Sequence, residues 1–205
     1  LLCLVGSEMC IRDSFKSGDD GYNCFRIPTI IKAKNDVILA FAEGRKKSCS
    51  DTGDVDLVYK KSRDNGKTWS SLKVIWDDGG NTCGNPSPVL DKKSGRISLL
   101  ATWNRGEDKE WQIIDQKSID TRHVYLIHSN DNGESWTNPK EITKNVKLDN
   151  WTWYATGPVN GYSTPILTSC AELITGAQTN DKNANTESIN FFIYFPSNLF
   201  FNYLI

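Results

Sequence analysis

Arg26 is the first residue of this sequence whose type and position suggest chemistry. It lies in the apolar stretch FRIPTII, residues 25–31. A guanidinium among apolar strand residues is costly unless it is paired or binds an anion. Pro28 cannot donate a hydrogen bond to a sheet ladder, so this strand is predicted to lie at a sheet edge. Arg26 therefore indicates either an anion-binding position at an exposed edge or a structural ion pair.

A second group of charged residues lies in EGRKKSCSDTGDVD, residues 43–56. Asp51 belongs to the loop itself and is free to project over a face. Asp54 and Asp56 alternate with apolar residues at the start of the next strand, and are predicted to be solvated or to cap a turn. Arg45 and Asp51 could equally form a surface ion pair that contributes little to stability.

The elements that position these residues are predicted to be strands joined by tight turns. Two octets, SRDNGKTW (62–69) and SNDNGESW (129–136), place an Asp-Asn-Gly triplet after an apolar-rich strand. An Asn-Gly pair tolerates the positive φ of a hairpin turn, and each Trp can cover its own turn. We interpret both octets as structural staples, and their repetition as a sign of repeated β-sheet units.

Strand-like runs dominate the chain and no long helical period is present, so the predicted class is all-β. The expected strands are FRIPTII (25–31), DVILAFAEG (36–44), DVDLVYKKS (54–62), LKVIW (72–76), SPVLD (87–91), GRISLLATW (95–103), RHVYLIHS (122–129) and KEIT (140–143). About four strands separate the two octets, which is typical of one propeller blade. The polar stretch 104–121 is predicted to be an inserted loop that forms a lip over a binding face.

Three motifs in this order resemble the sialidase (neuraminidase) superfamily, the exo-α-sialidases of bacterial and animal type. They are FRIP (25–28), EGR (43–45) and the two S-x-D-x-G-x-x-W octets. The octets alone are a weak signal, because other propellers and carbohydrate-binding proteins carry them. The resemblance covers roughly residues 20–160 and implies a partial six-bladed β-propeller of about three blades, with the octets as Asp-box hairpins away from the ligand.

The resemblance also implies roles for individual residues. Arg26 would be the first of three arginines that bind the carboxylate of sialic acid. Asp51 would be the general acid/base, with Asp54 as the second choice. Arg45 would contact the region of the sugar's 4-position. The glycerol or N-acetyl pockets would be lined by Asn85 and Trp103.

The family's other two arginines, its nucleophilic tyrosine and the glutamate that activates it belong to later blades. The segment WTWYATGPVNG (151–161) still resembles the family, but the pattern is lost beyond it. Tyr162, Tyr194 and Tyr203 are candidate nucleophiles by residue type alone. The chain is therefore expected to be the N-terminal half of a sialidase and to be inactive on its own.

The expected parent protein is an exo-α-sialidase that releases terminal sialic acid from glycoproteins, glycolipids or oligosaccharides by a retaining mechanism. One alternative is a non-catalytic sialic-acid-binding or Asp-box interaction propeller. The combination of Arg26 with Asp51 as a general acid argues against this alternative, because binding alone needs no proton donor. The other alternative is a gene-prediction fragment without function.

The composition limits the partners. At 205 residues and a formal net charge of −1, the chain has no overall field that would favour nucleic acid. The partners expected are sialylated glycoconjugates, with no cofactor and no metal site. The six cysteines match no zinc or redox spacing and are expected to be buried free thiols.

We expect three segments: a non-native leader (1–14), the propeller half (15–165) and a non-native or disordered tail (166–205). The leader resembles translated adapter sequence and would be a poor signal peptide. The apolar end, residues 189–205, is too short and too interrupted for a membrane helix, so no membrane span is expected in the matched region. The native compartment stays open between secreted, lysosomal and membrane-associated.

Overall fold

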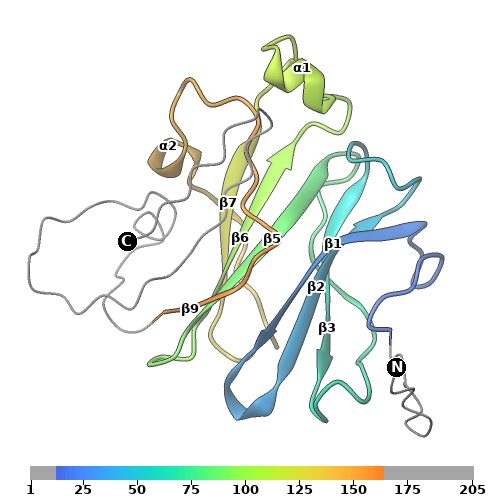
Figure 1. Cartoon of the computed structure of the whole chain (residues 1–205), viewed down its shortest axis with the longest axis vertical. Helices are drawn as coiled ribbons and strands as arrows, with labels where there is room; N and C mark the ends of the chain where they lie inside the picture. The colour runs from blue at the N-terminus through green and yellow to red at the C-terminus, as the bar shows by residue number, and fades with distance from the viewer. Residues whose placement is uncertain (1–12, 164–205) are drawn as a thin grey trace, which may run out of the picture.

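Antiparallel pairing connects the strands in two successive groups of four in the computed structural model, which describes residues 13–163 (Figure 1). The first unit contains β1 (Cys24–Lys32), β2 (Ile38–Arg45), β3 (Val55–Ser62) and β4 (Lys73–Trp76). The second unit contains β5 (Thr82–Asp91), β6 (Ile97–Asn104), β7 (His123–Ser129) and β8 (Lys140–Glu141). A parallel bridge between Val55 and Thr82 joins the two units.

The all-β class is confirmed, and the sheet is open rather than closed into a ring. A short strand, β9 (Gly161–Ser163), pairs in parallel with β5. The expected number of blades and the segment boundaries stay predictions. The tail (166–205), nearly all of the leader (1–14) and the candidates Tyr194 and Tyr203 lie outside the described residues.

The prediction of a loop over 104–121 is wrong for its middle, which forms the helix α1 (Glu110–Ile114). Ile113 is buried, and the side chain of Gln112 accepts a hydrogen bond from the backbone N–H of Lys109 at 2.9 Å. A second short helix, α2 (Thr143–Val146), ends the expected KEIT strand early, and the 3-10 turn η1 (Lys34–Asp36) joins β1 to β2. Burial of Val146 stabilises α2, because this side chain packs into a cluster with buried residues of β6 and β7.

The main core lies between the two units. Every second residue of the central strands is buried there, as the period of a strand requires. The contributing side chains are Leu39 and Phe41 of β2, Leu57 and Tyr59 of β3, Ile97 and Leu99 of β6, and Ile127 of β7. The opposite face of the first unit carries a smaller cluster in which Ala42 and Val58 pack against Tyr22. The units therefore hold one another by apolar burial rather than by their single parallel bridge.

Both octets form the same tight turn. Asn65 and Asn132 have φ of 60° and 56°, and each is followed by a glycine with positive φ. In the first turn, the Ser62 hydroxyl accepts the backbone N–H of Gly66 at 2.8 Å. Hydrogen bonds from the hydroxyl and backbone N–H of Thr68 hold the pKa of Asp64 well below its usual value. The serine and aspartate satisfy turn donors, as side chains of this kind commonly do.

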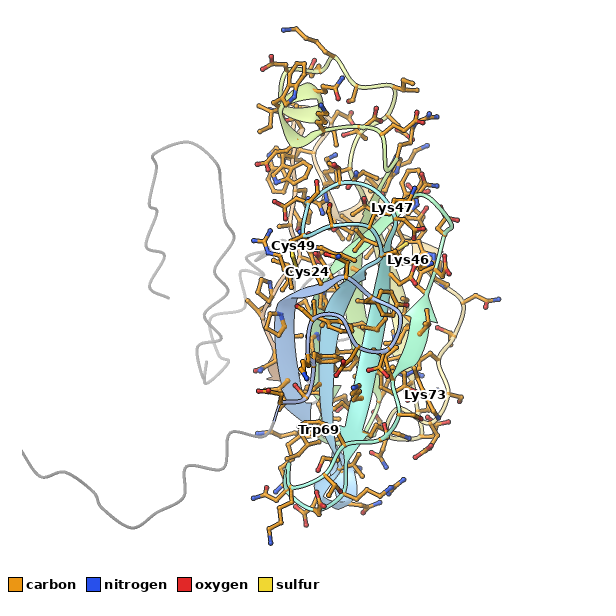
Figure 2. The ribbon with its side chains drawn as sticks, turned by 90° about the vertical axis from the view of Figure 1, so that its right-hand side faces the viewer. Cys24, Lys46, Lys47, Cys49, Trp69 and Lys73 are labelled. Atoms are coloured by element: carbon orange, nitrogen blue, oxygen red, sulfur yellow. A yellow bond between two sulfur atoms is a disulfide. The ribbon has the colours of Figure 1, made fainter. Side chains whose placement is uncertain are left out.

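The second turn also joins the two units. Its Trp136 packs edge-on against Phe41 and Tyr59 of the first unit, with ring centroids 5.8 and 5.7 Å away. The Tyr59 hydroxyl donates to the carbonyl of Gly133 at 2.9 Å. Trp69 of the first turn lies near the end of the sheet opposite Cys24 and Cys49 (Figure 2). The two octets are therefore scaffold, with the second one carrying a contact between units.

We expect a glycine-to-alanine substitution to destabilise the second turn more than the first. Gly66 and Gly133 have φ of 82° and 77°, so alanine is strained at either position. A Cβ on Gly133 would also lie 2.9 Å from Leu39 Cδ2, whereas at Gly66 the nearest atom, on Trp69, is 4.0 Å away. We expect Gly66→Ala to lower the free energy of unfolding by about 1–2 kcal/mol. Gly133→Ala should lower it by roughly 1–3 kcal/mol more, because it also overpacks the core.

Urea denaturation followed by tryptophan fluorescence measures both variants against the unmodified chain. Equal losses for the two substitutions would show that the second turn does not dock on the first unit as described.

Candidate active site

A bulge in β1 places Arg26 at the exposed edge of the sheet. β1 stands at one end of the strand order, which confirms the edge position predicted from Pro28. The register between β1 and β2 shifts between Arg26 and Thr29, and Ile27 has a φ of 54°. Positive φ is unfavourable for a β-branched residue and persists only where the surroundings impose it.

The same irregularity recurs in β5. Its register with β6 shifts between Gly84 and Ser87, and Asn85 has a φ of 53° directly before Pro86. Bulges re-aim side chains and are frequent next to active sites. The residue–proline pair is visible in the sequence of both strands, so this signal could have located both bulges.

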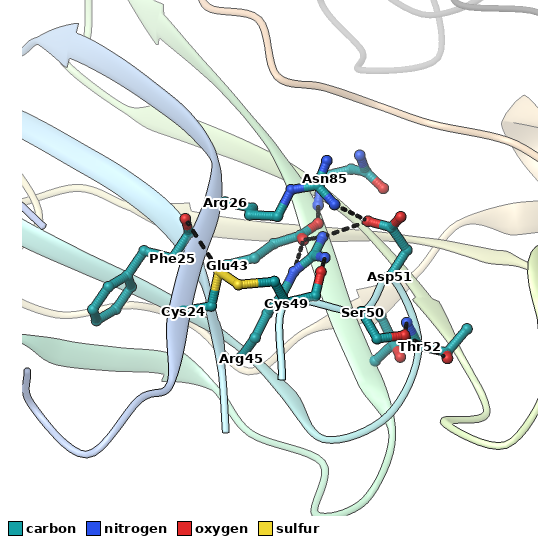
Figure 3. A network of polar contacts seen from close by, with 12 residues as sticks. Cys24, Phe25, Arg26, Glu43, Arg45, Cys49, Ser50, Asp51, Thr52 and Asn85 are labelled. Atoms are coloured by element: carbon teal, nitrogen blue, oxygen red, sulfur yellow. Dashed lines mark hydrogen bonds and ion pairs between the residues drawn. A yellow bond between two sulfur atoms is a disulfide. The ribbon is translucent and has the colours of Figure 1, made fainter. Parts of the chain in front are cut away.

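Arg26, Asp51 and Arg45 meet at the end of the sheet where β1 begins (Figure 3). Asp51 Oδ1 lies 2.8 Å from Arg26 Nη1 and 2.8 Å from Arg45 Nη2. The side chains of Arg26 and Asp51 are 44% and 53% exposed, whereas that of Arg45 is 3% exposed. The alternative of an ion pair at Arg26 is therefore realised in the structure, but on a surface that keeps both side chains accessible.

Glu43 supports this group from below, and sequence reasoning assigned it no role. Its carboxylate accepts a hydrogen bond from Arg45 Nε at 3.1 Å and from the backbone N–H of Asn85 at 2.9 Å. Both side chains of the Glu43–Arg45 pair are almost fully buried. A Cβ on Gly84 would stand 2.2 Å from Glu43 Oε1, so only glycine fits there. The i, i+2 spacing of Glu43 and Arg45 in a strand was the available signal, because it puts both on one face.

A disulfide joins Cys24 of β1 to Cys49 of the loop that carries Asp51. The expectation of buried free thiols is wrong for these two cysteines and right for Cys83, which is free and buried. Spacing along the chain could not reveal the bond, because the edge strand and the loop approach only in the folded sheet. Burial raises the pKa of the Cys83 thiol.

Asp54 and Asp56 face away from Arg26 toward Lys46. The Lys46 ammonium lies 3.2 Å from Asp54, 3.1 Å from Asp56 and 3.1 Å from Asp77. The prediction of a solvated Asp56 is wrong: the residue is 1% exposed and accepts the Tyr22 hydroxyl at 2.6 Å. Burial raises the pKa of Asp56, and Tyr22 and Lys46 counteract that rise. These three carboxylates already surround a cation, so we assign them a structural role.

Asn85 is the centre of a buried hydrogen-bonding network. Its Oδ1 accepts from Arg122 Nη2 at 2.7 Å and from the Thr102 hydroxyl at 3.0 Å, and its amide donates to the carbonyl of Gly157 at 3.1 Å. The Arg122 guanidinium lies 3.9 Å from the ring centre of Trp153, and burial lowers the pKa of Arg122 to about 10. Sequence reasoning missed Arg122, because a basic residue before a strand carries no specific signal.

Trp103 lies apart from the other predicted site residues. Its indole N–H donates to Asp78 at 2.7 Å, and its ring meets His123 edge-on. It lines a pocket of about 370 Å³, while Arg26 lines a separate one of about 290 Å³. The structure thus brings Arg26, Arg45 and Asp51 into contact and links Asn85 to them through Glu43, but does not join Trp103 to the group.

Comparisons with known proteins identify the family of this chain. Residues 36–193 match the family model described as a BNR repeat-like domain. The exo-alpha-sialidase of Aspergillus fumigatus is 38% identical over 172 residues, which cover 76% of this chain and 42% of the relative. The chain belongs to the sialidase superfamily.

Other superfamily members place limits on what this chain represents. The sialidase of Bacteroides fragilis is 30% identical over 159 residues, covering 71% of this chain and 29% of the relative. The solved Hadza microbial sialidase Hz136 is similar with a TM-score of 0.61 at 26% identity, covering 72% of this chain and 31% of that one. The chain therefore spans less than half the length of these sialidases. None of the helices between residues 13 and 163 has the length and apolar character needed to cross a membrane.

Because the Glu43–Arg45 pair is buried, we expect removal of one of its charges to lower the stability of the fold strongly. Glu43→Gln keeps the shape of the side chain but leaves the Arg45 guanidinium buried with less compensation. We expect the free energy of unfolding in urea to fall by roughly 3–5 kcal/mol. The matched control is Glu107→Gln, because the side chain of Glu107 is 86% exposed beside Arg105, and its loss should be below about 1 kcal/mol. A Glu43→Gln loss as small as that of the control would contradict the anchoring role of the pair.

Proposed function

We propose that the protein carrying this chain is an exo-α-sialidase that releases terminal sialic acid from glycoconjugates with retention, and that this chain forms the N-terminal part of its propeller. The observation that carries the proposal is the contact of Arg26 with Asp51 on an accessible face, 2.8 Å between Nη1 and Oδ1. An anion-binding guanidinium and a proton-transferring carboxylate are thereby within reach of the same sugar ring. The family membership of the chain supports the same assignment.

Arg26 is assigned to the carboxylate of sialic acid. A planar guanidinium can donate two parallel hydrogen bonds to a carboxylate, which fixes both the position and the orientation of the sugar. The exposed fraction of Arg26 and its place on an edge strand leave room for this approach. The substrate carboxylate and Asp51 then compete for the same guanidinium.

Asp51 is assigned as the general acid/base. It would protonate the glycosidic oxygen as the aglycone leaves and then activate the water that releases the sugar. Arg45 holds Asp51 from the buried side, and we assign it to the region of the 4-position through the family resemblance. Asn85 and Trp103 are assigned to the glycerol or N-acetyl pockets, with Trp103 reaching substrate only from its separate pocket.

The nucleophile is expected elsewhere. A tyrosine suits this reaction because a carboxylate nucleophile would be repelled by the substrate carboxylate beside the anomeric carbon. The backbone of Tyr162 in β9 pairs with Leu90 of β5, and no sequence motif supports this residue as the nucleophile. The tyrosine, its glutamate and two more arginines are assigned to later blades, so this chain alone should not turn over.

The test compares two substrates in the full-length protein that carries this chain. Asp51→Asn keeps the shape but removes the transferable proton, so hydrolysis of a natural sialoside should fall about 10²–10⁴-fold. Hydrolysis of an aryl sialoside, whose phenolate leaves without a proton, should fall far less. Arg26→Lys keeps the charge but loses the two parallel hydrogen bonds to the carboxylate. It should lower the hydrolysis of both substrates to the same extent.

Asp54→Asn is the matched control, because Asp54 pairs with Lys46 and faces away from Arg26. If Asp51→Asn lowers the hydrolysis of both substrates equally, Asp51 is not the general acid. A full-length protein that binds sialic acid but hydrolyses neither substrate would favour the second candidate, a non-catalytic sialic-acid-binding propeller.

A further inference from the structure

Two cross-links run side by side between β1 and the loop of residues 46–54. The disulfide joins Cys24 to Cys49, and two residues further along each segment the ion pair joins Arg26 to Asp51. Both cross-links therefore span 25 positions of sequence. Figure 3 shows the two links next to one another, with the covalent one nearer the start of β1.

The ionic link cannot be permanent if Arg26 binds a substrate carboxylate. The nitrogen that contacts Asp51 would have to be shared or released when a second carboxylate arrives. Among the ion pairs between residues 13 and 163, Asp51 would then keep its contact with Arg45 Nη2, at 2.8 Å. The loop tip is otherwise exposed: Lys47, Ser48, Cys49, Ser50 and Asp51 all face solvent.

Few other contacts hold the tip of the loop in place. The backbone N–H of Lys46 donates to the carbonyl of Asp54 at 3.1 Å and closes its base. Arg45 Nη1 donates to the carbonyl of Cys49 at 2.6 Å. The ends of the loop are tied to its surroundings, because the Thr82 hydroxyl of β5 donates to the carbonyl of Gly53 at 2.9 Å and the Lys46 ammonium contacts Asp56 and Asp77. At the tip, further hydrogen bonds join Ser48, Ser50 and Thr52 to one another. The disulfide is the one covalent tie between the tip and β1 among the described residues.

We propose that Cys24 and Cys49 are positioning residues, whose disulfide keeps Asp51 beside the sugar when the substrate carboxylate takes over Arg26. This inference rests on the proposed function. It adds a redox requirement to that function, because a dithiol breaks the S–S bond, forms two thiols and is itself oxidised to a cyclic disulfide. Disulfides of this kind persist in oxidising compartments.

A role in stability alone is the competing explanation, because closing a loop stabilises any fold by restricting the unfolded chain. The two explanations differ in what reduction does to the loop and to the leaving-group dependence. A positioning role predicts a local release of Asp51 and a defect in proton transfer. A stabilising role predicts a lower melting temperature without either effect.

The first experiment uses this chain and requires no activity. Arg26→Ala removes the ionic link, and amide hydrogen exchange is followed over residues 46–54 with the disulfide oxidised or reduced by dithiothreitol. The oxidised Arg26→Ala chain should exchange as slowly as the unmodified chain, and the reduced Arg26→Ala chain at least about tenfold faster over the loop, because a local opening exposes its amides. Fast exchange in the oxidised variant would overturn the inference, because the disulfide would then fail to hold the loop.

The second experiment uses the full-length protein and the two substrates named above. Cys24→Ser with Cys49→Ser should lower kcat/KM at least about tenfold on the natural sialoside, a misplacement cost well within the usual range, and much less on the aryl sialoside. Dithiothreitol should reproduce this pattern in the unmodified protein and have no effect on the double variant. Cys83→Ala is the control: it removes a buried free thiol and should leave the ratio of the two substrates and the response to reductant unchanged.

Equal losses of kcat/KM on both substrates, or a lower melting temperature with unchanged kinetics, would overturn the positioning role. The disulfide would then only stabilise the fold. If the unmodified protein hydrolyses neither substrate, the proposed function fails, and the exchange experiment still decides whether the disulfide holds the loop.

Discussion

The buried pair of Glu43 and Arg45 is the constraint on which the candidate site depends. Glu43 accepts the backbone N–H of Asn85, so the same carboxylate ties β2 to the bulge of β5. Arg45 uses one edge of its guanidinium for Glu43 and reaches Asp51 and the carbonyl of Cys49 with the rest. A buried charge whose partner is lost is strongly destabilising, so neither residue can move without the other. The loop carrying Asp51 is thereby built on the core of the sheet.

The charges of this group also limit what it can bind alone. Two guanidinium groups, on Arg26 and Arg45, face two carboxylates, on Glu43 and Asp51, so the contacting group is neutral. An incoming sialic acid carboxylate would have to displace Asp51 from Arg26 or meet further cations. Under the proposed function the two arginines of later blades supply them. Under the same proposal, Arg26 is paired with Asp51 before the substrate arrives and passes to the substrate carboxylate when the sugar binds.

The sequence predicted the parts of this arrangement that depend on local pattern. Apolar alternation located the long strands, the Asn-Gly pairs located both turns, and Pro28 located the edge. Burial of Asp56, the role of Glu43 and the Cys24–Cys49 bond could not be predicted in the same way, because each depends on residues that approach only across the sheet. Arg26 and Asp51 were paired through a family resemblance, and the geometry that puts them in contact comes from the bulge at Ile27 and the fixed loop.

A crystal structure of the full-length protein with sialic acid bound tests the central claim most directly. The account predicts that the sugar carboxylate lies within hydrogen-bonding distance of both terminal nitrogens of Arg26, about 2.7–2.9 Å away. Asp51 should have left Arg26, stayed on Arg45 and kept its loop in place beside an intact Cys24–Cys49 bond. A bound sugar whose carboxylate lies away from Arg26, with the Arg26–Asp51 ion pair unchanged, would contradict the account.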